Sequence, residues 1–148
     1  MGLGGSKSSF RGVLWSLMAI QTIPFLFTVT ASGTVSQQTR SVITDKFRVI
    51  RLKCFFPSGV QNQVKIYFYS ASESTGGTSK PSGSNLLATA QSPTADPYIV
   101  GDDVFLVVDN FTEIDSATGQ YLVVYAENSD SANAYEVQAF IEYQDLEE

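Results

Sequence analysis

Acidic side chains are the residues of this sequence best placed to do chemistry. Five of them fall within fourteen consecutive positions: Asp102, Asp103, Asp109, Glu113 and Asp115. Carboxylate oxygens on the loops of a β-domain can bind calcium, so Asp102, Asp103 and Asp109 are the candidate calcium ligands. Their spacing does not fit an EF-hand loop, and the adjacent Asp102 and Asp103 would face opposite ways on a strand. We therefore expect solvated loop acids, with no metal and no cofactor.

Histidine and cysteine chemistry has almost no residues to work with. The chain has no histidine and one cysteine, Cys54. This excludes histidine-based acid–base catalysis, the common zinc sites and an intrachain disulfide. Leucine and phenylalanine residues surround Cys54, which is typical of a small buried hydrophobic side chain and not of a reactive thiol. No two carboxylates have the arrangement that a glycosidase needs, so we expect a structural or binding protein and not an enzyme.

Charge is distributed unevenly along the 148 residues, whose net charge is −6. Residues 1–54 carry seven Lys or Arg and one acid, a net +6, whereas residues 55–148 carry two Lys and fourteen acids, a net −12. An acidic chain is unsuited to general nucleic-acid binding, since phosphate contacts need a basic surface. We therefore expect no specific nucleic-acid partner.

Four of the basic residues fall on one expected strand. They are candidates for an inter-subunit contact, where complementary potentials fix the register of two chains: Lys46, Arg48, Arg51 and Lys53. Pairing with the acidic half of the same chain is the simpler alternative.

The N-terminal region has no charged residue between Arg11 and Arg40, and residues 12–31 are largely apolar. One interpretation is a secretory signal peptide that is cleaved after Ala31. A second is a membrane anchor, since about 20 apolar residues span a bilayer. A third is a strand of the fold, or an arm that crosses into a neighbouring subunit.

The sequence after residue 23 supports the third interpretation. Its apolar side chains alternate with the period of a strand, not that of a helix. The residues that we assign to a candidate assembly arm are Pro24, Phe25, Phe27 and Val29. Membrane contact through residues 12–31 is the alternative use of the same region.

The remainder of the chain predicts strands and turns. β-branched and aromatic residues are frequent, and such residues fit pleated sheets. Alternating or apolar runs separated by turn signals predict strands at residues 41–56, 62–72, 86–91, 98–109, 120–127 and 134–144. Within 41–56 the alternation slips by one residue, which predicts a bulge or bend. Residues 73–85 contain no large apolar side chain and predict a long loop.

Strands at this spacing predict an all-β fold, an antiparallel two-sheet β-sandwich of jelly-roll type, with an apolar N-terminal arm or anchor. The expected organisation is a flexible polar and basic tail at 1–11, the arm, anchor or signal segment at 12–40, the β-sandwich domain at 41–144 and an acidic tail at 145–148.

The strand series resembles the small jelly-roll and β-sandwich proteins of virions, namely capsid, penton and decoration subunits. The residues that carry this resemblance are FRVIRLKCFFPSG, VKIYFYSAS, YIVGDDVFLVVD, QYLVVYAEN and YEVQAFIEY, within residues 41–144. The resemblance implies a structural subunit in a virion or at a cell surface, which self-assembles or docks with other structural subunits through its sandwich and its N-terminal arm. The alternative is a secreted or surface-anchored β-sandwich module that binds carbohydrate or protein.

Overall fold

The computed structural model describes residues 20–39, 43, 45–88, 95–115 and 119–146. The expected flexible tail at 1–11, the apolar residues 12–19 and the last two acids of the acidic tail lie outside these residues. No helix that meets the length and hydropathy of a membrane span occurs in the described part. This part contains strands throughout, in the order β1 (Ile20–Val29), β2 (Thr34–Gln38), β3 (Phe47–Phe56), β4 (Val64–Ala71), β5 (Ser84–Asn85), β6 (Val104–Asp109), β7 (Glu113–Ile114), β8 (Tyr121–Asn128) and β9 (Tyr135–Asp145).

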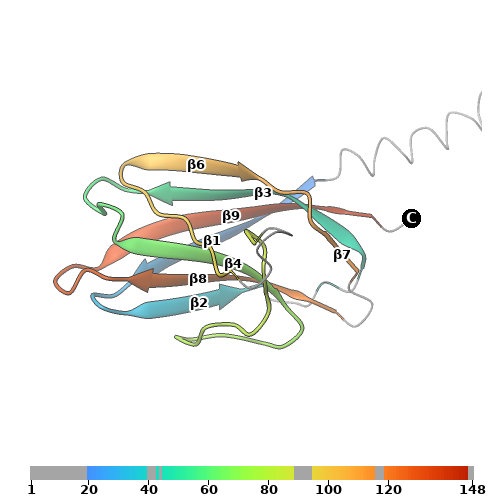
Figure 1. Cartoon of the computed structure of the whole chain (residues 1–148), viewed down its shortest axis with the longest axis horizontal. Coiled ribbons are helices and arrows are strands. Elements are labelled where there is room, and N and C mark those ends of the chain that lie inside the picture. Colours follow the sequence, from blue (N-terminus) through green and yellow to red (C-terminus); the bar gives the residue numbers. More distant parts are fainter. Residues whose placement is uncertain (1–19, 40–42, 44, 89–94, 116–118, 147–148) are drawn as a thin grey trace, which may run out of the picture.

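The strands form two antiparallel sheets that pack face to face (Figure 1). Sheet A has the order β1-β9-β3-β6, with β7 also paired to β3, and sheet B has the order β2-β8-β4-β5. The pairing is nested: β1 pairs with β9, β2 with β8, β3 with β6, and β4 with β5. Nested antiparallel pairs folded into two sheets make a jelly roll. The all-β sandwich predicted from the sequence is therefore confirmed.

The sandwich begins before residue 41, so the predicted domain boundary needs correction. β1 pairs with β9 along ten residues, from Ile20 opposite Gln144 to Val29 opposite Tyr135. The alternation predicted after residue 23 is present, because Phe25 and Phe27 are buried with Val29 while Leu26 is exposed. The uncharged run resembled a separate segment because the outward face of β1 is neutral as well.

β3 contains the predicted irregularity. Its register with β9 shifts between Val49 and Arg51, so that one extra residue enters the strand. The shift turns Arg51 to the same outer side of sheet A as Arg48, while Val49 and Leu52 remain buried. The bulge therefore places the basic side chains of this strand on one face.

The expected strand at 86–91 is not present at residues 86–88. β5 is Ser84–Asn85, and the chain turns at 86–87. Leu86 is buried in the core, where its backbone N–H donates to the carbonyl of Phe68 at 2.8 Å. The apolar pair at 86–87 anchors a turn, which a hydrophobic pattern alone does not distinguish from a short strand.

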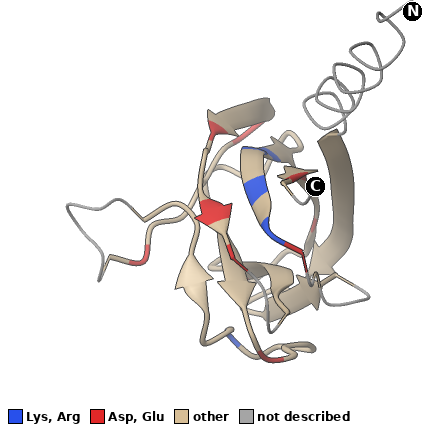
Figure 2. Ribbon diagram, turned by 90° about the vertical axis from the view of Figure 1, so that its right-hand side faces the viewer, with Lys and Arg blue, Asp and Glu red and all other residues tan. Residues whose placement is uncertain are grey.

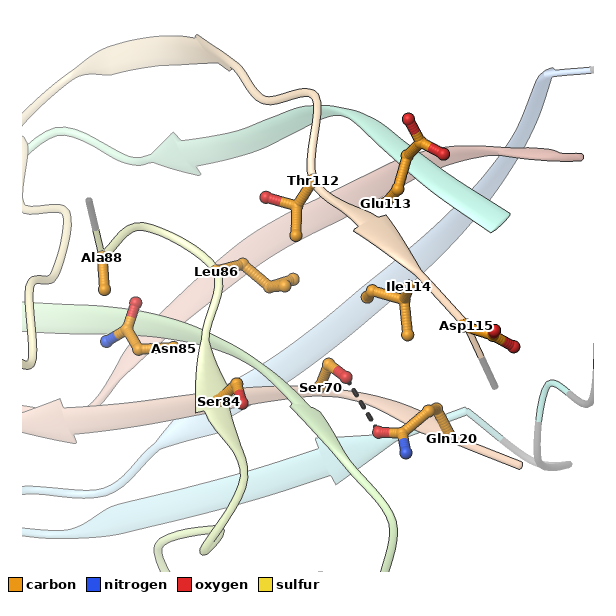
Figure 3. Close-up of a pocket in the computed structure, with 10 residues that line it drawn as sticks. All are labelled: Ser70, Ser84, Asn85, Leu86, Ala88, Thr112, Glu113, Ile114, Asp115 and Gln120. Carbon is orange, nitrogen blue, oxygen red and sulfur yellow. Dashed lines mark hydrogen bonds between the residues drawn. The ribbon is translucent and has the colours of Figure 1, made fainter. Parts of the chain in front are cut away.

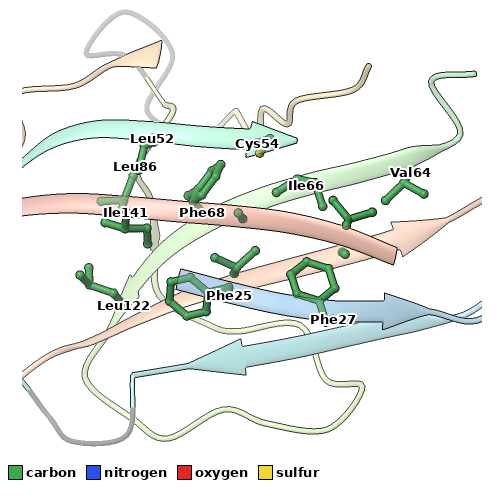
Figure 4. Packing of buried hydrophobic residues seen from close by; sticks show 14 of the residues in the cluster. Phe25, Phe27, Leu52, Cys54, Val64, Ile66, Phe68, Leu86, Leu122 and Ile141 are labelled. Atoms are coloured by element: carbon green, nitrogen blue, oxygen red, sulfur yellow. The ribbon is translucent and has the colours of Figure 1, made fainter. Parts of the chain in front are cut away.

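The core lies between the two sheets and receives side chains from both (Figure 4). Phe47 and Phe56 of β3 and Phe68 of β4 are fully buried. Cys54 is fully buried among them, and burial raises the pKa of its thiol. The prediction of a buried cysteine is confirmed.

The side chain of Asn128 connects the end of β8 to the end of β1 through hydrogen bonds. Its Nδ2 donates to the carbonyls of Val29 (3.3 Å), Thr30 (3.1 Å) and Asn133 (2.8 Å), and its Oδ1 accepts from the N–H of Asp130 (2.9 Å). The residue is 4% exposed. One buried amide therefore satisfies three carbonyl groups at this end of the sandwich.

Replacing this amide by a carboxylate should be costly. Asn128→Asp removes every donor and turns an acceptor towards three carbonyls, which we expect to lower the free energy of unfolding by about 3 kcal/mol. Urea unfolding followed by circular dichroism measures the change. Ser131→Asp is the control, since it adds the same charge at an exposed position of the same loop. Equal midpoints for the two variants would contradict this role of Asn128.

Candidate functional site

The structure separates the three calcium candidates. Asp102 and Asp103 precede β6 and Asp109 ends it, which places the two ends about 20 Å apart at the rise of a strand. Asp102 already has a structural use, since its Oδ1 accepts from the backbone N–H of Gly59 (2.8 Å) and of Gln61 (3.0 Å). Across the described ranges, no three acidic or cysteine side chains gather as metal ligands would.

A pocket of about 380 Å³ opens between β7 and the segment that follows β5 (Figure 3). Ser70 donates to the side chain of Gln120 at 2.9 Å within it. Glu113 lies at its rim and accepts from Arg48, a hydrogen bond that holds the pKa of Glu113 below its usual value. The lining offers hydroxyl, amide and carboxylate groups with no cation among them. The charged groups of its described lining are two carboxylates, Glu113 and Asp115.

The four basic residues singled out in the sequence all have acidic partners within the chain. Lys46 and Arg48 lie 3.7 and 3.0 Å from Glu113. Arg51 and Lys53 lie 2.5 and 2.7 Å from Glu142. Figure 2 shows basic residues gathered on β3 beside acidic stretches of other strands. Pairing between the two halves of one molecule, the simpler alternative, therefore occurs, and an inter-subunit role for these residues stays a prediction.

Glu142 is the centre of the more buried of these two clusters. Its side chain is 11% exposed. Burial alone would raise the pKa of Glu142, but hydrogen bonds from Lys53 and Arg51 outweigh that effect and hold it below its usual value. Glu142 is therefore ionised at neutral pH and neutralises part of the basic strand.

Next to this cluster, the outer side of sheet A carries exposed and half-buried apolar residues. We call this set the apolar face; it consists of Leu26, Phe55, Phe105, Val107 and Phe140. Leu26 is 60% exposed, and Phe105 and Val107 are each 54% exposed. The rings of Phe105 and Phe140 lie stacked with their centroids 6.2 Å apart. The face extends across the sheet, because Phe105 is opposite Phe55, Phe55 is opposite Gln138 and Gln138 is opposite Leu26, so that one polar residue stands in this row.

Sequence reasoning missed this face. The run VFLVV of β6 is apolar on both of its sides, a pattern typical of a strand that is buried on both faces. The structure buries only one of these sides against the core and leaves the other in solvent. The absence of apolar–polar alternation in this run is the sequence signal that could have indicated the apolar face.

The outer side of sheet B is covered by the chain itself. Tyr67, Tyr69 and Tyr125 are buried there beneath the segments that precede and follow β5. Asp96 accepts from the hydroxyl of Tyr69 at 2.5 Å and also binds Lys80. These tyrosines are therefore packed side chains and not an open platform for a sugar ring.

The residues of the candidate assembly arm lie in β1. Phe25, Phe27 and Val29 fill the core of their own molecule, so these side chains are not available to a neighbour. Pro24 faces outwards on this edge strand, where it lacks an N–H to donate. An arm contact through β1 would have to use its outer side, and the assembly role of these residues stays a prediction.

No protein-family description matches the chain, and no curated protein sequence matches it. Similar solved structures include two from virions. A variant of VP2 of infectious bursal disease virus, in T=1 particles, matches 86% of this chain and 32% of its own, with 7% identity and a TM-score of 0.43. The structure of Sulfolobus turreted icosahedral virus matches 86% of this chain and 29% of its own, with 13% identity and a TM-score of 0.41.

A third solved structure is PliG of Aeromonas hydrophila, a periplasmic inhibitor of g-type lysozyme. It matches 85% of this chain and 89% of its own, with 12% identity and a TM-score of 0.41. The chain spans only 32% and 29% of the two viral proteins. Virion proteins are thus among the solved structures to which the chain is similar.

Proposed function

We propose that this protein is a structural subunit, and not an enzyme, which self-assembles or docks into a larger assembly such as a virion shell or a surface filament. The observation that carries the proposal is the apolar face of sheet A. Phe105 and Val107 stand half in solvent on a flat sheet surface, next to Phe55 and Phe140.

Contiguous apolar surface of this kind is uncommon on a soluble monomer and marks an interaction site. The rest of the molecule makes the contrast clear. The outer side of sheet B carries more aromatic residues, but loops of the same chain cover them. The outer side of sheet A has no such cover among the described residues, so an external macromolecule is the natural partner.

The proposal also explains why no described cluster resembles a reaction site. The acids near β6 are separated or bound to backbone N–H groups, and the pocket near β7 contains no cation. A shell or filament subunit needs a rigid scaffold and complementary surfaces, which the jelly roll supplies.

Release as a free module after cleavage at Ala31 is disfavoured by the position of β1. Cleavage there would remove a strand that fills the core. The intact mass of the natural protein tests this point directly, since a mass that begins at residue 32 would contradict an uncleaved N-terminal strand.

Sedimentation velocity of the full chain tests the proposal itself. Between low and high micromolar concentrations we expect species heavier than the 16.1 kDa monomer. A chain that remains a monomer over the whole range, alone and with its natural co-purifying partners, would contradict a role as an assembling subunit.

A further inference from the structure

We infer that the apolar face pairs with the same face of a second copy of this chain, in a contact with two-fold symmetry. The inference rests on the proposed function and specifies the partner. Its support comes from the charge of this face and from its shape.

The side of sheet A that carries the apolar face is electrically balanced. Among the outward-facing residues of its strands and their ion-pair partners, four bases and four acids sum to zero: Lys46, Arg48, Arg51 and Lys53 with Asp109, Glu113, Glu136 and Glu142. The other described residues contain two bases, Lys65 and Lys80, and nine acids, a net −7. Within the described ranges, the apolar face is therefore the neutral side of an acidic molecule.

Two acidic molecules repel each other over most approaches, and the repulsion is smallest where their neutral sides meet. Any acidic partner would be repelled in the same way, except at this neutral side. A second copy of the chain is one acidic partner that is present wherever the protein is. A basic partner would instead be drawn to the acidic remainder of the molecule. The charge distribution therefore favours a second copy over other occupants of the apolar face.

The shape of the face is complementary to itself. Phe105 projects from β6 at one side of sheet A. At the other side, a depression of about 260 Å³ lies between residues 26–28 of β1 and residues 136–138 of β9. Phe105 and this depression lie on the same row of cross-strand neighbours, with Phe55 of β3 between them.

A two-fold axis through the middle of the row places Phe105 of each copy over the depression of the other. In such an isologous contact, each residue meets a different residue of the partner, and every contact occurs twice. Phe105 of one copy then approaches Glu136 of the other. Within one chain, β3 lies between the strands of Phe105 and Glu136, and the two residues are offset by two positions along the strands. At the spacings of a sheet, this separation is about 12 Å.

This separation permits a rescue experiment. We expect Phe105→Glu in the full chain to weaken self-association at least about tenfold, because its carboxylate would enter the depression beside the partner's Glu136. Adding Glu136→Lys to the same chain should restore most of the association. Tyr98→Glu is the control, since it adds the same charge at an aromatic residue that is 45% exposed on the side of sheet B.

Sedimentation equilibrium measures the dissociation constants of the three variants and the natural chain, after circular dichroism has shown that each is folded. A loss with Phe105→Glu, its recovery with Glu136→Lys and no change with Tyr98→Glu is the expected result. If the natural chain alone is monomeric at every concentration, this pairing fails, whereas the proposed function fails only if the chain also binds none of its natural partners. If it associates and Phe105→Glu changes nothing, or if Glu136→Lys does not restore the loss, the pairing fails and the proposed function stands.

The alternative occupant of the apolar face is the N-terminal apolar segment at 12–19. Trp15 lies in this segment and provides a test. The chain has one tryptophan, so its emission reports on that segment alone. A red shift of this emission with Phe105→Glu in dilute monomer, with self-association unchanged, would assign the face to that segment and overturn the pairing.

Discussion

A chain that begins at residue 32 is expected to remain unfolded at room temperature. It lacks the whole of β1, and with it the buried side chains of Phe25, Phe27 and Val29. Truncating one buried phenylalanine costs about 3–5 kcal/mol, and here two are lost together with a valine and a ten-residue ladder to β9. The sum approaches or exceeds the stability of about 5–15 kcal/mol that a whole domain has.

Heteronuclear NMR spectra and far-ultraviolet circular dichroism measure this result. A chain that begins at residue 12 is the control, because it removes only the polar and basic residues 1–11. We expect dispersed amide resonances for the control and collapsed ones for the chain that begins at residue 32. A cooperatively folded shorter chain would show that β1 is dispensable and would reopen cleavage after Ala31.

The second large effect concerns the cluster of Glu142. Glu142→Gln removes the carboxylate shared by Arg51 and Lys53, whose side chains are 39% and 25% exposed. Breaking a fully buried pair costs about 3–5 kcal/mol. The partial exposure of both cations reduces this penalty, so we expect a loss of about 2–3 kcal/mol in the free energy of unfolding.

The chain contains a matched control for this variant. Glu113 also binds one lysine and one arginine, but its side chain is 46% exposed. Because exposed ion pairs contribute little, Glu113→Gln should lower the stability far less than Glu142→Gln does. Urea unfolding of the two variants measures the difference, and equal losses would contradict the importance of burial at Glu142.

The effect of Glu142 also has a pH dependence of known sign. The folded protein holds the pKa of Glu142 below its usual value of 4.5. A lowered pKa stabilises the fold above the pKa of the unfolded chain, and this contribution is lost as the pH falls through the folded value. The natural chain and Glu142→Gln should therefore differ fully at neutral pH, and the difference should shrink as the pH falls through the lowered pKa of Glu142. A difference that is constant down to pH 2 would contradict this assignment.

The sequence predicts the strands more securely than it predicts which strands meet. The alternation of β9, the alternation after residue 23 and the slip within β3 depend only on neighbouring residues, and all three are present. The pairing of Arg51 with Glu142 joins residues 91 positions apart. Such a contact depends on the order of strands in sheet A, which no local pattern specifies.

The apolar face illustrates a second limit. Phe105 and Val107 are residue types typical of a core, and only the arrangement of the two sheets shows that no described segment covers them. The same holds for Leu86, whose apolar neighbour suggested a strand where the chain turns. Hydrophobicity predicts that a side chain seeks burial, and the partner that buries it must be found from the three-dimensional arrangement.

The pairing of β1 with β9 also determines when the fold can be completed during synthesis. Ile20 lies opposite Gln144, so β1 leaves the ribosome long before β9 and must wait for it. Contacts between such distant residues slow folding, roughly to milliseconds or longer for all-β domains. Until β9 emerges, the side chains of Phe25 and Phe27 remain exposed on an unpaired strand. This interval is the period in which chaperones would protect the nascent chain, and in which crowded copies would be most prone to misassembly.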